Sequence, residues 1–190
     1  MKRKMKLISY TALTLIANVI FISPVHADVQ IDTNNGSADT YINVTAPATD
    51  NLYLTQAPDF NFSNTEATTT GAISTKGTAA YTILNITGNS NGYNLQQKIS
   101  EFTGNINGKP TVLPLKYFKI SVADNASGTI RGSNAVNILG QAGRVLTGQR
   151  NAQGNQTSGG ATAEIQLDTT REIKPGAYQA TITNTLVQGL

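Results

Sequence analysis

Alternation of apolar and polar side chains is the dominant pattern in this chain, and it is clearest in residues 175–186, PGAYQATITNTL. Pro175 and Gly176 are turn residues, because Pro fixes φ and Gly accepts a positive φ. After them, one face of the alternation carries Tyr178, Ala180, Ile182, Asn184 and Leu186. Such a period of two is typical of a half-buried β-strand, so we expect this face to lie in the core. Asn184 is its one amide among apolar side chains.

Similar runs recur along the chain between clusters of Gly, Asn, Asp and Pro. They predict strands within residues 40–46, 52–62, 79–86, 93–99, 113–122, 135–139 and 161–167. Residues 65–77 are expected to form a solvated connection or a weak edge strand, and the Gly- and Gln-rich residues 140–160 a long loop or a poorly ordered hairpin. After the first 27 residues no window has a helical period. The chain is therefore predicted to be all-β, with a single antiparallel β-sandwich domain.

The first 27 residues follow a different pattern. Four basic residues precede the apolar run 7–22, which is followed by Val25, His26 and Ala27. This order is typical of a secretory signal peptide, and the run is short and polar for a membrane helix. We therefore expect a secreted protein whose mature form has no membrane span. The expected organisation is a signal peptide at 1–27, a lead-in with the first strand at 28–50, and the sandwich domain at 51–190.

Removal of the signal peptide changes the charge and the available chemistry. It takes 4 of the 14 basic residues and the only His, which leaves 10 basic and 11 acidic residues, a net charge of −1. A net charge so close to zero gives no support for a nucleic-acid partner, because such a partner is bound through an excess of basic residues. Without His or Cys, catalysis by Ser-His-Asp or Cys-His and metal binding through imidazole or thiolate are excluded. The expectation is a non-enzyme with no catalytic, metal or cofactor residues, although a carboxylate-only glycosidase remains an alternative.

Three segments resemble the WxL-domain surface proteins of Gram-positive bacteria. Residues 52–62 (LYLTQAPDFNF) are similar to an early strand of that family, and residues 87–95 (TGNSNGYNL) to its first Gly-Trp-x-Leu segment. Residues 176–183 (GAYQATIT) resemble its terminal strand, with residues 184–186 (NTL) at the second Trp-x-Leu position. The resemblance extends from residue 52 to residue 186. An exported protein without Cys is also typical of Gram-positive surfaces.

Both signature tryptophans of that family are replaced here. The motif positions, structural or wall-binding, are Tyr93, Leu95, Asn184 and Leu186. Because Tyr93 and Asn184 lie on apolar faces, a structural role in the core is favoured over stacking on a sugar. If the space left by the second tryptophan is vacant, Asn184→Trp is expected to stabilise the domain.

The resemblance implies an extracellular protein of the cell wall or cell surface. Its expected partners are peptidoglycan or an associated wall polymer, held non-covalently, with other surface proteins as a second class of partner. A pilin-like structural subunit of a surface fibre is the alternative, because residues 175–183 also resemble the closing strand of fimbrial subunits. Such subunits exchange an N-terminal strand between neighbours, and residues 28–39 are short of the apolar side chains that a donated strand needs.

Overall fold

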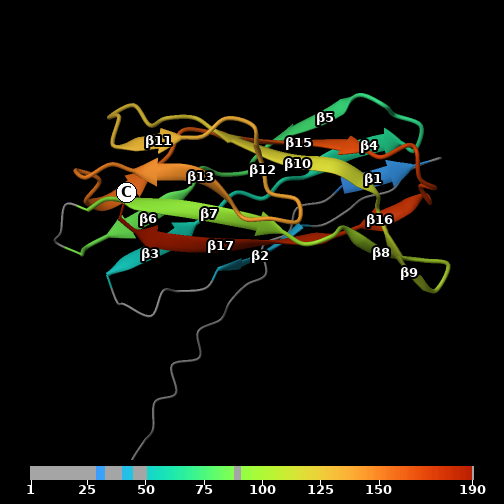
Figure 1. The fold of residues 1–190 in the computed structure, drawn as a ribbon, viewed down its shortest axis with the longest axis horizontal. Coiled ribbons are helices and arrows are strands. Elements are labelled where there is room, and N and C mark those ends of the chain that lie inside the picture. Colours follow the sequence, from blue (N-terminus) through green and yellow to red (C-terminus); the bar gives the residue numbers. More distant parts are fainter. Residues whose placement is uncertain (1–28, 33–39, 45–50, 88–90, 190) are drawn as a thin grey trace, which may run out of the picture.

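The computed structural model describes residues 29–32, 40–44, 51–87 and 91–189 of the chain (Figure 1). The expected signal peptide, residues 1–27, lies outside this part, as does most of the expected lead-in. The described residues form seventeen strands and no helix, which confirms the all-β prediction. No described segment is a helix with the length and apolar character needed to cross a membrane.

Two larger sheets pack together as a β-sandwich (Figure 1). The five-stranded sheet contains, in spatial order, β11 (Ile130–Gly132), β13 (Gly143–Gly148), β7 (Tyr93–Ile99), β17 (Ala180–Gln188) and β2 (Thr40–Val44). The four-stranded sheet contains β12 (Val136–Asn137), β10 (Leu115–Val122), β15 (Ala161–Leu167) and β5 (Ala72–Lys76). Side chains of both sheets, such as Leu95, Ile182 and Phe118, belong to one hydrophobic core. Burial of the two apolar faces against each other stabilises the pair of sheets.

Three smaller sheets complete the domain. They are β16 (Gly176–Tyr178), β1 (Val29–Asp32) and β4 (Phe62–Glu66); β14 (Gly154–Thr157), β6 (Thr82–Asn85) and β3 (Leu52–Gln56); and the hairpin of β8 (Thr103–Ile106) and β9 (Lys109–Val112). Among the described strands the pairings are antiparallel except β1 with β4 and β2 with β17, which are parallel. β1, which belongs to the expected lead-in, therefore lies in the middle of its sheet.

The closing strand of the chain has the burial that its alternation predicts. Tyr178 and Ile182 are fully buried, Leu186 is half-buried, and Thr183 and Thr185 between them are exposed. The buried Tyr178 hydroxyl donates a hydrogen bond to the backbone carbonyl of Lys174, at 2.5 Å. A buried phenol needs such a partner, because an unsatisfied hydroxyl in the core costs free energy. The final strand is thus an inward-facing element of the sandwich, as expected.

Residues 140–160 are the segment for which the prediction was wrong. In place of a long loop they contain β13, which lies between β11 and β7 inside the five-stranded sheet, and β14. The register of β13 shifts between Arg144 and Leu146, and the consecutive residues Val145 and Leu146 are both fully buried. A β-bulge puts two neighbouring side chains on the same face and so interrupts the period of two. That interruption removed the signal by which strands are recognised in a sequence.

Candidate functional site

The two segments that carry the motif positions lie side by side, although about 90 residues separate them in the chain. β7 and β17 are antiparallel neighbours at the centre of the five-stranded sheet (Figure 1). Their register places Leu95 opposite Leu186 and Asn184 opposite Gln97. Because side chains of opposed residues point to the same face of a sheet, the four motif positions share one face of one strand pair.

That shared face is the inner face of the sandwich. Tyr93 and Leu95 are fully buried, Asn184 is 3 % exposed, and Leu186 is half-buried against the core. A ligand outside the domain has no access to the ring of Tyr93 or the amide of Asn184. The motif positions are therefore part of the core, as the sequence favoured.

The ring of Tyr93 packs directly on the backbone of Gly148, its partner on β13. A Cβ atom added to Gly148 would lie 2.1 Å from Cζ of Tyr93, which is far inside van der Waals contact. Position 148 therefore has no room for a side chain while the ring of Tyr93 lies against it. The Tyr93 hydroxyl is enclosed without a hydrogen-bond partner among the described residues. Burial raises the pKa of this hydroxyl, because the charged phenolate would lose its hydration.

Asn184 belongs to a short chain of buried polar side chains. The Tyr81 hydroxyl donates to Oε1 of Gln97 at 3.0 Å, and Nε2 of Gln97 donates to Oδ1 of Asn184 at 2.6 Å. Burial raises the pKa of Tyr81, and the hydrogen bond to Gln97 offsets part of that effect. Nδ2 of Asn184 has no partner among the described residues. The position that the resemblance assigns to a second tryptophan is thus occupied by an amide pair.

Gln97 and Tyr81 were not among the residues selected from the sequence. Gln97 follows Tyr93 and Leu95 at intervals of two and precedes Ile99 at the same interval, so the alternation of β7 places it inward. It is 1 % exposed. A polar residue at an inward position on the strand that pairs with Asn184 was the available signal. The partner of that amide was therefore readable once the register of the two strands was known.

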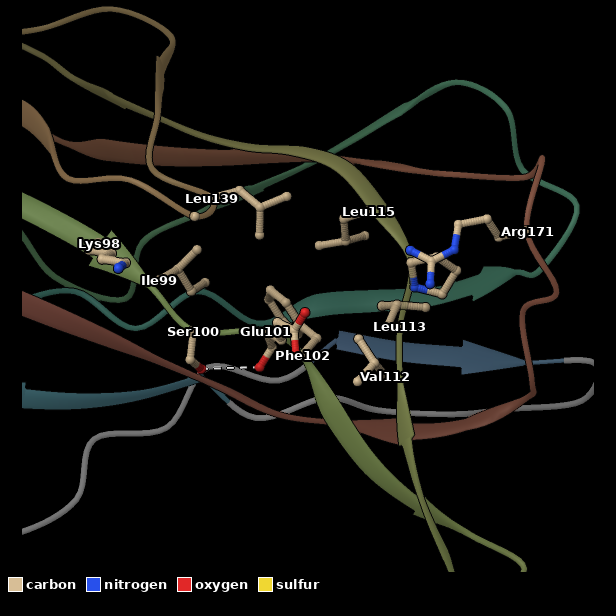
Figure 2. A pocket seen from close by; sticks show the side chains of 12 residues that line it. Lys98, Ile99, Ser100, Glu101, Phe102, Val112, Leu113, Leu115, Leu139 and Arg171 are labelled. Carbon is tan, nitrogen blue, oxygen red and sulfur yellow. Dashed lines mark hydrogen bonds between the residues drawn. The ribbon is translucent and has the colours of Figure 1, made fainter.

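A groove of about 350 Å³ opens at the end of β7 that lies away from Tyr93 (Figure 2). Its floor is made mostly by the apolar side chains of Ile99, Phe102, Leu113, Leu115 and Leu139. Val112 lies beside them and is 41 % exposed, which is unusual for a large hydrophobic residue of this domain. Four parts of the chain, 98–102, 112–115, 139–140 and 171, meet here. No motif connects them, which is why the sequence did not indicate this groove.

Three exposed charged side chains border the groove. Figure 2 shows Lys98 and Arg171 at opposite ends of the lining, with Glu101 between them in this view. The salt bridge found among the described residues lies outside the groove lining and joins Nη1 of Arg131 to Oδ2 of Asp124, at 2.6 Å. Among the described residues, neither Lys98 nor Arg171 has a carboxylate at salt-bridge distance.

Arg171 also lies near Asp168, outside the groove lining. The pKa of Asp168 is lowered chiefly by the hydrogen bonds from Thr170 and further by the charges of Lys116 and Arg171, against the opposing effect of desolvation. Part of the Arg171 charge is thus balanced by Asp168.

The groove lining holds few ionisable side chains. Glu101 is the one carboxylate in the lining, whereas a glycosidase uses two carboxyl groups at a defined separation. Over the described residues there is no group of three or more His, Cys, Asp or Glu side chains placed to hold a metal ion. An apolar floor with a few charged groups at its border is typical of a ligand-binding hollow.

Comparison of the chain with family models, with curated proteins and with solved structures gives no match. The fold is therefore established by the structure itself, as an all-β sandwich.

Proposed function

We propose that the chain is an exported binding module of the Gram-positive cell surface, which associates non-covalently with wall peptidoglycan, an attached polymer or a neighbouring surface protein. The observation that carries this proposal is the groove, because its apolar floor and charged border suit recognition of a ligand. In this reading the protein performs no catalysis, and the sandwich is a scaffold that holds the groove.

Two further features support the proposal. Residues 1–27 have the order of charges and apolar side chains of a signal peptide. The segments on which the WxL resemblance depends, at 87–95 and 176–186, include two central strands that pair in register along their motif positions. Segments that resemble one family and also meet in space give more support to a WxL-like domain than the same segments scattered over the molecule.

The pilin-like alternative receives less support from the pairing of β1. A fibre subunit of that kind donates its N-terminal strand to a neighbour. Here β1 pairs with β16 and β4 of its own chain, so its hydrogen-bonding groups are used within the molecule. A ladder of bands on gels run without boiling would favour the fibre subunit instead.

The test is sedimentation with purified sacculi. The full chain is expressed in a Gram-positive host, and the exported protein is mixed with sacculi prepared with and without teichoic acid. We expect it in the pellet with both preparations if peptidoglycan is the partner, and with the first alone if teichoic acid is. Retention in the host cytoplasm would contradict export. Recovery in the supernatant with both preparations would contradict binding to the wall polymers and leave a neighbouring surface protein as the partner.

A further inference from the structure

The groove has an aliphatic floor with no open aromatic face. Phe102 contributes its one ring, which is 1 % exposed and stacked on Phe118, with ring centroids 5.8 Å apart. The ring of Phe102 is thus buried in the core, and it offers no exposed face in the groove on which a sugar could stack. Burying sugar hydroxyls against the aliphatic side chains Leu113 and Leu139 would cost free energy, because neither offers a hydrogen bond. The floor suits small apolar groups such as methyls.

The charged border adds a second condition on the ligand. Lys98 and Arg171 stand at opposite ends of the lining and face solvent without a described salt-bridge partner. Glu101 supplies one negative charge to the same border. Complementary charges set register and specificity more than affinity. The matching ligand carries carboxylates toward both ends and one amine, with apolar groups between them.

We propose that this groove binds the peptide stem of peptidoglycan rather than its glycan strand. The inference rests on the wall-binding function proposed above and names the part of the polymer that is read. A peptide stem combines alanine methyl groups with carboxylates and a side-chain amine, which is the combination that the floor and border accept. A volume of about 350 Å³ is near the lower end for ligand pockets, so a few small residues fill it.

The experiment measures binding of three soluble probes to the exported protein by isothermal titration calorimetry. The probes are a tetrapeptide stem with the natural D-residues and a lysine amine, chitotetraose as the glycan, and an all-L peptide of the same composition. We expect binding of the stem, weaker binding of the all-L peptide and none of chitotetraose. The stem should also displace the protein from sacculi.

Variants then assign the binding to this groove. Lys98→Ala and Arg171→Ala each remove one exposed charge and should each weaken stem binding about two- to fivefold. Val112→Asp places a carboxylate beside the floor and should weaken it more than about tenfold. Arg150→Ala is the matched control, because Arg150 is exposed in the connection between β13 and β14, beyond the opposite end of β7. It should bind as the parent does, and all four variants should keep the parent's melting temperature within a few degrees.

The outcomes separate this inference from the function on which it rests. The peptide-stem assignment would be overturned if chitotetraose displaced the protein from sacculi, or if all the groove variants still bound sacculi as the parent does. Either result would leave wall binding intact. Tighter binding of the all-L peptide than of the stem would overturn it too, in favour of a protein partner. If the protein ignores sacculi but binds the stem, and Lys98→Ala weakens that binding, the wall-binding proposal fails and the groove assignment is upheld.

Discussion

The interior of the β7–β17 pair and the groove at the end of β7 use neighbouring residues for opposite purposes. Tyr93 and Asn184 are enclosed and touch other parts of the core, whereas Lys98 and Arg171 are exposed at the groove border. One strand therefore contributes core side chains along its length and, at its end, part of the groove for which we propose a ligand. The residues selected from the sequence, such as Tyr93 and Asn184, are the interior ones. Substitutions in the interior should therefore change the stability of the domain, whereas substitutions at the groove should change ligand binding.

The strongest way to break this division is Tyr93→Ala. Loss of a fully buried ring should lower the free energy of unfolding by about 3–5 kcal/mol, because the space above Gly148 is left unfilled. Urea unfolding of the exported protein measures the change. Tyr117→Ala on the half-buried outer face of β10 is the control and should cost far less. Equal losses for the two variants would mean that Tyr93 is no more part of the core than Tyr117.

A smaller effect is expected when the amide pair is broken. Asn184→Leu leaves Nε2 of Gln97 without its acceptor and should cost about 1–3 kcal/mol. The double variant with Gln97→Leu should recover part of that loss, and a double-mutant cycle gives the coupling between the two side chains. Additive losses would contradict the pairing.

The same amide pair reverses the expectation for the second tryptophan position. Asn184→Trp should lower the melting temperature, because it removes the acceptor of Nε2 of Gln97 and puts a much larger side chain at a buried position. Stabilisation of this variant would show that the position retains vacant volume. Thermal unfolding followed by circular dichroism distinguishes the two results.

A matched pair of Tyr→Phe changes sharpens the comparison within the core. Tyr93→Phe removes a buried hydroxyl that has no described partner, so it should be neutral or stabilise by up to about 1 kcal/mol. Tyr178→Phe removes the donor to the Lys174 carbonyl and should destabilise by about 1 kcal/mol. Chemical unfolding of both variants tests the difference in sign. Losses of the same size would indicate that the Tyr93 hydroxyl is bonded after all.

The mildest test changes pH in place of sequence. Burial raises the pKa of Tyr81, Tyr93 and Tyr178 above that of an unfolded tyrosine. The unfolded chain then loses these protons first, so their contribution to stability is complete below about pH 10 and is lost as the pH rises further. Melting temperatures between pH 7 and pH 11.5 measure this decline, which should be shallower in Tyr93→Phe. A melting temperature that stays constant over that range would contradict the assignment of these hydroxyls to the core.

Much of the fold was predictable because period-two alternation reports burial directly. The inward set of β17 and the strand within residues 52–62 were predicted from residues next to one another in the chain. β5 lies at a sheet edge, in the segment that was expected to be a solvated connection or a weak edge strand. β13 was missed because its bulge breaks that period. The parallel partners of β1 and β2 were also beyond prediction, since pairing depends on segments far apart in the sequence.

The candidate sites divide in the same way. Tyr93, Leu95, Asn184 and Leu186 were found because each belongs to an alternating run, and their burial follows from it. The groove depends on four segments that meet only after folding, and its charged residues stand at the ends of strands or in turns, where no periodicity marks them. The local pattern of the sequence therefore predicted the buried core of the β-sandwich better than it predicted the exposed groove.

The position of β17 has a consequence for how the protein is made. The last of the described strands in chain order, β17, lies between β7 and β2, so the five-stranded sheet cannot close until residues near 188 have been synthesised. Before that point β2, near the beginning of the chain, has no partner in its sheet and must wait for more than 130 residues to follow it. Contacts of such long sequence separation form slowly. Until β17 is present, this sheet is limited to β11, β13 and β7, whereas the four-stranded sheet uses only strands that end by residue 167.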